Sequence, residues 1–186
     1  MAELHLIGQL HSLELHEPEA SLVGTLGTSG FYCVYRLALS EGWTHLEGSF
    51  SGRTQTTKDR LEPHAIWNFP LDTHLITKTF QNWPRVVFEV WRTDVLNRSE
   101  ILGYGTIHLP SRAGRHHLAV PLWRPLGCNL EEIQRNFLGG GYQLTSFDSL
   151  AAGTERYKLQ TTGVGYLFLD VNLILRNLAK FGVRTS

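Results

Sequence analysis

Cysteine is scarce in this sequence: Cys33 and Cys128 are the only two, they lie far apart, and they form no Cys-x-x-Cys unit. Small secreted domains usually carry paired cysteines, so this pattern indicates reduced thiols in a cytosolic protein. No basic and apolar signal sequence opens the chain, and no apolar run approaches the roughly 18 residues that a membrane span needs. We therefore expect a soluble protein of the cytoplasm.

An excess of charge of one sign is also missing, because 17 Lys and Arg balance 17 Asp and Glu. The composition therefore excludes a strong field that would attract nucleic acid or an anionic membrane, and any recognition of phosphate has to be local. Of the 17 basic residues, 13 are arginine, which suits specific planar contacts better than diffuse attraction. The balance of charge predicts no nucleic-acid partner.

The motifs of catalysis, phosphate binding and metal binding are absent as well. There is no Gly-x-Ser-x-Gly, and neither Cys33 nor Cys128 has the histidine pattern of a cysteine nucleophile. The glycines at 139–141 are not part of a Gly-Lys-Ser/Thr phosphate loop. Of the nine histidines, His116 and His117 are adjacent and would face opposite ways on a strand, so they cannot hold one ion. We expect a non-enzyme with no cofactor and no metal.

Apolar residues alternate with polar ones in several segments, which is typical of half-buried strands. The clearest is "YLFLDVNLILRN" (166–177), where leucine and valine occupy every second position and Asp170, Asn172 and Arg176 lie between them. In "RVVFEVW" (85–91), Val86, Phe88 and Val90 would face inward. Other strands are predicted at 3–10, 30–39, 64–71, 103–109, 116–122 and 156–162, with turns marked by glycine and proline, including Gly163-Val164-Gly165. Many short strands without alternating helices predict an all-β fold, an antiparallel C2-like β-sandwich.

The length of 186 residues fits a single domain spanning 1–186. One short helix near 130–138 is predicted within the sandwich, because Asn129 can cap it, Glu132 completes an Asn-x-x-Glu box and Gly139 can end it. The segment near 40–62 is rich in polar residues and glycine, and we expect a mobile connection there beside a weak strand.

The stretch "VWRTDVLNRSEILGYG" (90–105) has the frame of a calcium-binding loop of C2 domains, in which an Asp-x-Asp pair and a later acid supply oxygen ligands. The three acid positions are occupied by Arg92, Asp94 and Glu100. A guanidinium at Arg92 repels a cation, so the loop is predicted to be a degenerate calcium site that holds no ion.

Beyond this loop, a longer series of residues resembles the B9 domain, a divergent relative of C2 domains in ciliary proteins. The matching elements, in order, are Trp83-Pro84, Trp91, Gly103-Tyr104-Gly105, Pro110-Ser111, Trp123-Arg124-Pro125-Leu126-Gly127, Gly139-Gly140-Gly141 and Arg176-Asn177. The resemblance covers most of the chain from about 65 to 183.

The resemblance implies a place at the base of the cilium, in the basal body and transition zone, within the cytoplasm and cytoskeleton. It implies association with the first B9 paralogue and the Meckel syndrome type 1 protein. It further implies membership of a membrane-linked complex containing tectonics that gates protein entry and supports ciliogenesis. These expectations come from the resemblance alone.

Two surfaces are candidates for recognition. Exposed aromatic and edge residues would serve partner proteins, and the candidates are Trp91, Trp123, Arg124, Pro125 and Leu126. The alternatives are a packing role for Trp91, which large aromatic residues favour, and a rigid corner at Pro125 with Arg124 stacked on Trp123. A basic cluster would contact phosphate, anionic lipid or an acidic partner, or form an ordinary solvated loop, and it comprises Arg112, Arg115, His116 and His117. The first hypothesis is a calcium-independent scaffold; the alternative is a calcium-independent peripheral membrane module that binds phosphoinositides.

Overall fold

A computed structural model of the chain describes residues 1–16, 30–58, 64–79, 82–94, 97–127, 143–144 and 159–178. The regular elements of these residues are all strands, so the predicted all-β class is confirmed. No helix in this part of the chain is long and apolar enough to cross a membrane. The strands are β1 Ala2–Leu15, β2 Gly30–Ala38, β3 Trp43–Gly48, β4 Ser51–Arg53, β5 Thr57–Lys58, β6 His64–Thr77, β7 Arg85–Thr93, β8 Ser99–His108, β9 Gly114–Pro125 and β10 Thr161–Arg176.

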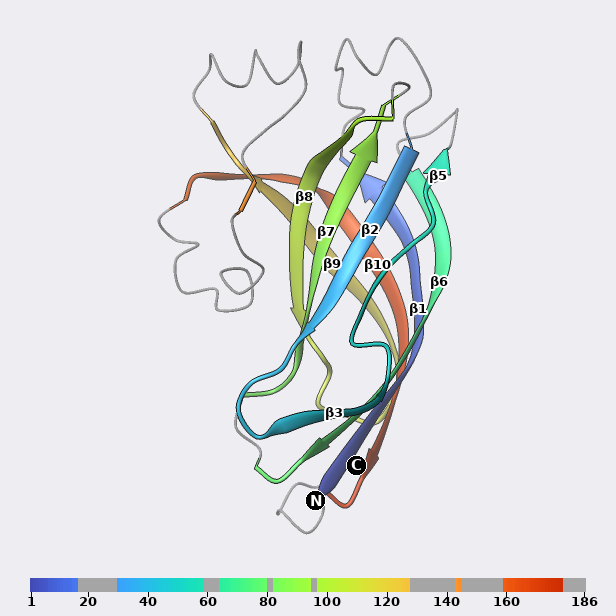
Figure 1. Ribbon diagram of the computed structural model, residues 1–186, viewed down its shortest axis with the longest axis vertical. Helices are drawn as coiled ribbons and strands as arrows, with labels where there is room; N and C mark the ends of the chain where they lie inside the picture. The colour runs from blue at the N-terminus through green and yellow to red at the C-terminus, as the bar shows by residue number, and fades with distance from the viewer. Residues whose placement is uncertain are drawn as a thin grey trace.

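The strands form one antiparallel sheet that curls back on itself in the order β3-β6-β1-β10-β9-β8-β7-β2-β4, with β5 paired to β2. Figure 1 shows the result as two layers, with β2, β7 and β8 in front of β9, β10 and β1. The layers join between β8 and β9, where Tyr104 is opposite Trp123. The predicted C2-like sandwich is therefore a sheet folded at this join.

The core lies between the two layers and follows the alternation of the sequence. On β7, Val86, Phe88 and Val90 are buried, and the odd-numbered residues of β10 from Leu167 to Leu173 are buried as well. Each such side chain contributes about 1.5–3 kcal/mol on leaving water. The inward faces predicted for both strands are confirmed.

Glycine allows β1 and β10 to approach closely. One prediction from the sequence was wrong at this place. Gly163-Val164-Gly165 was predicted as a turn, but the segment lies inside β10, where the pairing register shifts. A Cβ on Gly165 would lie 2.1 Å from the Glu14 carbonyl oxygen of β1. Glycine at 165 therefore serves strand pairing, because any side chain would collide with neighbouring backbone.

Three short strands, β3, β4 and β5, lie within the described part, 40–58, of the segment near 40–62, where the sequence predicts a mobile connection beside a weak strand. The Thr54 hydroxyl accepts a hydrogen bond from the Cys33 amide at 3.0 Å, and the Thr54 amide donates to the Cys33 carbonyl at 2.9 Å. The Gln55 side chain donates to the Trp67 carbonyl of β6 at 2.7 Å. Polar side chains thus tie this segment to both layers, which composition alone does not reveal.

Two predicted elements lie wholly or partly beyond these residues. The helix near 130–138 is outside the described residues, as is Cys128. The strand predicted at 156–162 overlaps β10 only at its end, because β10 begins at Thr161 and residues 151–158 are also outside the described part.

Candidate functional site

The loop predicted as a degenerate calcium site joins β7 to β8. Arg92 and Glu100 stand opposite each other in the β7–β8 register, and the Arg92 guanidinium donates to Glu100 Oε1. Their side chains are 11% and 17% exposed. At this burial neither charge can be left uncompensated without a substantial cost, so each side chain supplies the opposite charge that the other requires.

The other acid of the loop, Asp94, holds the turn that follows β7. Its Oδ2 accepts from Arg98 Nε at 2.7 Å and its Oδ1 accepts from the Arg98 amide at 2.8 Å. The Asp94 amide in turn donates to the Arg98 carbonyl at 3.0 Å. The sequence did not single out Arg98 as the partner of Asp94, although its spacing of four residues from Asp94 was the available signal.

Each of the two carboxylates is therefore engaged by an arginine. Calcium needs six to eight oxygen ligands, and at this loop it would first have to displace both guanidinium groups. Among the described residues, no group of three or more His, Cys, Asp and Glu is disposed to hold a metal ion. The arrangement favours ion pairs, not a metal ion, as the contacts that join the two sides of the loop.

Trp91 lies on the outer face of the front layer, as its alternation with Val90 predicts. Its ring is stacked parallel to Tyr32 of β2 with centroids 6.1 Å apart, and Arg53 of β4 covers Tyr32 at 3.7 Å. Trp91 Nε1 donates to Glu89 Oε2 at 3.2 Å. Half-buried Trp91 thus joins a row of aromatic and charged side chains across three strands.

Glu89 is the ionisable group within this row. Burial raises the pKa of Glu89 above its ordinary value, and this effect outweighs the Trp91 hydrogen bond and the Arg36 guanidinium, which both favour the ionised carboxylate. Keeping the Glu89 carboxylate ionised on the outer face of β7 therefore lowers the free energy of unfolding.

The segment from Trp123 to Leu126 is divided between packing and exposure. Trp123 is only 6% exposed and packs against Tyr104, with ring centroids 5.7 Å apart. Arg124 and Pro125 are half-buried, and Pro125 pairs with Thr161 of β10. Leu126 is 44% exposed. Of the four candidates in this segment, Leu126 offers the most surface to a partner.

The basic cluster lies at the turn between β8 and the start of β9. Arg112 and Arg115 are exposed. His116 forms a hydrogen bond with the Arg112 carbonyl at 2.9 Å, whereas His117 is paired with Asp170 of β10 on the outer face. Because the two histidines face opposite sides of β9, the four side chains do not converge on one phosphate-sized site.

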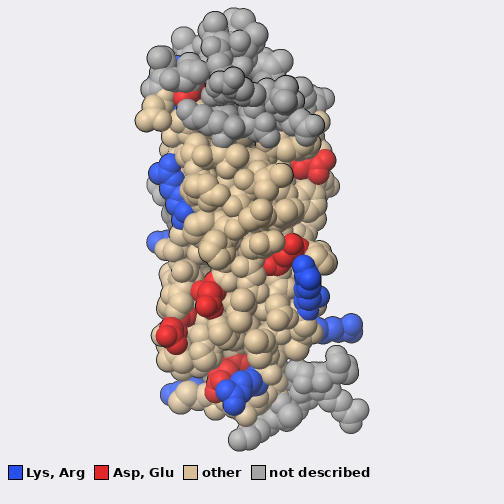
Figure 2. Space-filling model, turned by 90° about the vertical axis from the view of Figure 1, so that its right-hand side faces the viewer, with Lys and Arg blue, Asp and Glu red and all other residues tan. Residues whose placement is uncertain are grey.

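Pairs of histidine and carboxylate across the outer face of the back layer were missed by the sequence analysis. The His5 ring is 2.8 Å from Asp72 and stacks on His74 at 5.2 Å. The hydrogen bond with His117, the largest influence, lowers the pKa of Asp170 below its ordinary value. Figure 2, viewed from the side of β6 and β1, shows acidic and basic residues interspersed, so this face carries no field of one sign.

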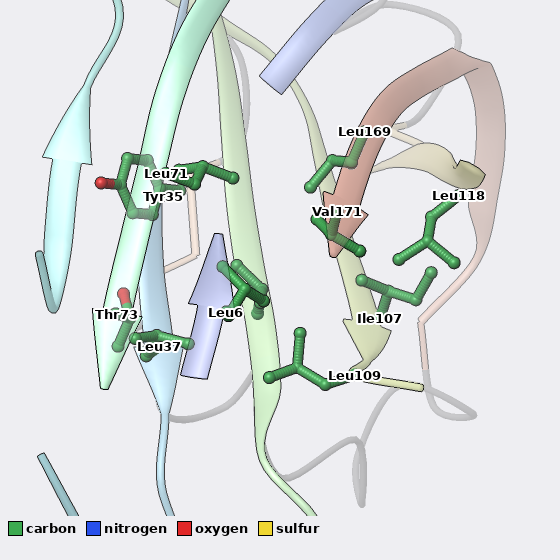
Figure 3. A pocket seen from close by; sticks show the side chains of 11 residues that line it. Leu6, Tyr35, Leu37, Leu71, Thr73, Ile107, Leu109, Leu118, Leu169 and Val171 are labelled. Atoms are coloured by element: carbon green, nitrogen blue, oxygen red, sulfur yellow. The ribbon is translucent and has the colours of Figure 1, made fainter. Parts of the chain in front are cut away.

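An apolar cavity lies between the layers (Figure 3). Its volume is about 10 Å³, which is at the lower limit for a single water molecule. A lipid or other small-molecule ligand does not fit there without rearrangement of the core. The lining comes from both layers and includes Leu6, Tyr35, Leu71, Ile107, Leu118 and Leu169.

Comparisons with known proteins agree with the family inferred from the sequence. A sequence model of the B9-C2 family, described as "Ciliary basal body-associated, B9 protein", matches residues 4–174. B9 domain-containing protein 2 of Homo sapiens is 38% identical over 98% of this chain and 99% of its own length. The Drosophila melanogaster protein of that name is 36% identical over 98% of both chains.

More distant similarity extends to B9 domain-containing protein 1 and to solved structures, among them a C2 domain of a plant protein. B9 domain-containing protein 1 of Homo sapiens is 27% identical over 83% of this chain and 78% of its own length. The C2A domain of plant Extended Synaptotagmin 1 aligns with a TM-score of 0.45 at 10% identity, covering 91% of this chain and 92% of that chain.

Proposed function

This chain belongs to the B9 family of ciliary basal body-associated proteins, and we propose that it is a non-catalytic scaffold subunit of the ciliary transition zone. In this role it binds other B9 proteins through its protein surface, within a membrane-linked assembly that supports ciliogenesis and the ciliary diffusion barrier. The partners are the first B9 paralogue and the Meckel syndrome type 1 protein, with tectonics in the larger complex.

One observation supports this proposal most directly: the two acids that remain in the calcium-type loop are engaged by Arg92 and Arg98. A C2-like domain whose loop is filled by arginines has no ready means of calcium-triggered membrane binding. The small apolar cavity also offers no room for a ligand. Recognition is then left to the outer surfaces and strand edges.

Co-expression with B9 domain-containing protein 1 tests the proposal. We expect the two chains to co-purify as a complex of fixed stoichiometry after size-exclusion chromatography. Failure to bind either this paralogue or the Meckel syndrome type 1 protein would remove the scaffold function.

Calcium-independent binding to phosphoinositide membranes is the second candidate, favoured by exposed Arg112 and Arg115. It has less support because His117 is paired with Asp170 and His116 faces the other side of β9, so neither histidine joins the two arginines in one phosphate site. Flotation with phosphatidylcholine vesicles that contain phosphatidylinositol bisphosphate decides between the two. The scaffold proposal expects the free chain to remain with the unbound protein.

A further inference from the structure

The border between β8 and β9 is only partly closed. Gly105 packs against Val120 and Leu122, where a Cβ would meet both side chains at 3.0 Å, so the border is closed there. We call its open part the β8–β9 seam, formed by residues 106–109 on one side and 114–119 on the other. Along β9, pairing with β10 is continuous from Gly114 to Leu122, whereas the pairing of β9 with β8 among the described residues is limited to Trp123 and Tyr104. In an antiparallel ladder, every second residue of β9 directs its N–H and C=O away from β10 and therefore toward the seam.

Apolar side chains line the inner side of the seam. Ile107 of β8 and Leu118 of β9 lie beside each other at one side of the interlayer cavity, with Leu109 below them (Figure 3). Ile107 and Leu118 are half-buried rather than buried. A strand placed along β9 would cover both side chains while pairing with the backbone.

β8 beyond Glu100, the following turn and β9 carry basic residues and no acidic ones; the carboxylate of the adjoining strand β10, Asp170, is paired with His117. The sequence contains no Asp or Glu from Ile101 to Leu130, although the whole chain is neutral. Arg112 lies in the turn at the end of the seam and Arg115 lies on the outer face of β9, and both are exposed. Neither forms an ion pair with a described residue. An occupant with acidic side chains would complement these arginines.

We propose that the β9 edge between Gly114 and Ala119 binds an extended, acidic segment of a partner protein as an added β-strand. Strand addition uses the main chain for affinity and alternate side chains for specificity, and the seam supplies both. A lipid headgroup could use the arginines but could not pair with the backbone of β9. This inference deepens the proposed scaffold function and rests on it for the biological identity of the partner.

Residue-resolved hydrogen exchange with a synthetic peptide tests the site. The probe is a peptide of about eight residues, the length of an ordinary strand, in which Glu alternates with Val. We expect added protection at alternate amides of residues 114–119, namely those not bonded to β10. Uniform protection along β9, or no change there at saturating peptide, would overturn the proposal.

Charge-reversal variants test the complementarity. Replacing both seam arginines (Arg112→Glu and Arg115→Glu) should weaken binding of the acidic peptide by about tenfold or more. The same variant should bind a peptide in which Lys replaces Glu better than the native chain does. The matched control is Lys78→Glu, an exposed site just after β6, three strands from β9 in the sheet, and it should leave affinity unchanged. Equal loss in the control would contradict the proposal.

The outcomes separate this inference from the scaffold function. If the peptide protects β9 but no B9 protein co-purifies, the strand site stands and the scaffold function fails. If B9 proteins co-purify and neither peptide nor partner protects the alternate amides, the scaffold function stands and the strand site fails. Binding to phosphatidylinositol bisphosphate vesicles without amide protection would reassign the arginines to a membrane and overturn the strand site.

Discussion

Arg92 and Glu100 face each other across β7 and β8 and form an ion pair at the position where a calcium-binding C2 loop would gather its ligands. In the loop predicted to be a degenerate calcium site, the two side chains therefore form an internal contact of the protein. Asp94 is engaged in the same way by Arg98. Both acidic side chains of the loop are thus paired with arginines, which supports the proposal of recognition without calcium.

A double-mutant cycle at Arg92 and Glu100 measures how much the ion pair contributes to the free energy of unfolding. Arg92→Ala should lower the free energy of unfolding by about 1–3 kcal/mol, because it leaves a largely buried carboxylate without its guanidinium. Glu100→Ala should behave similarly, and the double variant should lose less than the sum of the two. Chemical denaturation of all four proteins gives the coupling energy. A coupling near zero would show that the pair does not fix the loop.

Glu89→Gln should stabilise the protein at neutral pH by on the order of 1 kcal/mol or less, since the side chain is only half-buried. Burial raises the folded-state pKa of Glu89 above 4.5, so the native state binds the proton more tightly than the unfolded state. Native stability from this group is therefore present at low pH and falls as pH rises through the folded pKa. Thermal melting from acidic to neutral pH checks this: the advantage of Glu89→Gln should grow with pH, and a constant advantage would contradict it.

His117→Ala should raise the pKa of Asp170 toward its ordinary value, because the hydrogen bond from His117 is the largest cause of its lowering. A depressed folded-state pKa gives stability that is present above the unfolded value and lost as pH falls through the folded value. The variant should thus lose at most about 1 kcal/mol near neutral pH, as expected for an exposed pair. NMR titration of the Asp170 carboxyl carbon follows the pKa directly, and an unchanged value would assign the lowering to another group.

Gly165→Ala should destabilise the fold by about 1–3 kcal/mol or more, the usual cost of overpacking, because its Cβ would meet the Glu14 carbonyl. Gly163→Ala, two residues earlier in β10, is the matched control, since a Cβ there has nothing within 4 Å. Denaturant midpoints of the two variants give the comparison. Similar losses at both sites would mean that the close approach of β1 and β10 is not what requires glycine.

The sequence was sufficient for the parts of the fold that depend on alternation. Period-two burial identified β7 and β10 and the faces of Phe88 and Leu169, because a strand exposes successive side chains to opposite environments. It could not reveal that Thr54 and Gln55 tie the polar 40–58 segment to Cys33 and Trp67, because such contacts depend on which strands become neighbours. For the same reason the sequence predicted a turn at Gly165, whereas glycine is required there because the backbone of Glu14 on β1 lies so close.

The candidate site was predictable to a similar extent. Arg92, Asp94 and Glu100 were identified because they occupy fixed positions in a loop frame, and their spacing also brings them close in space. The pairing of His117 with Asp170 joins residues that are 53 positions apart, so it cannot be predicted from a local sequence pattern. The partly open border between β8 and β9 likewise appears only when the curl of the sheet is known.

The central claim is that this domain recognises its partners without calcium. The most direct test is the affinity of the purified chain for B9 domain-containing protein 1, measured once in a calcium chelator and once in millimolar calcium. The account predicts equal dissociation constants under both conditions. Binding that appears only with calcium, and is lost again when Asp94 and Glu100 are neutralised, would contradict it.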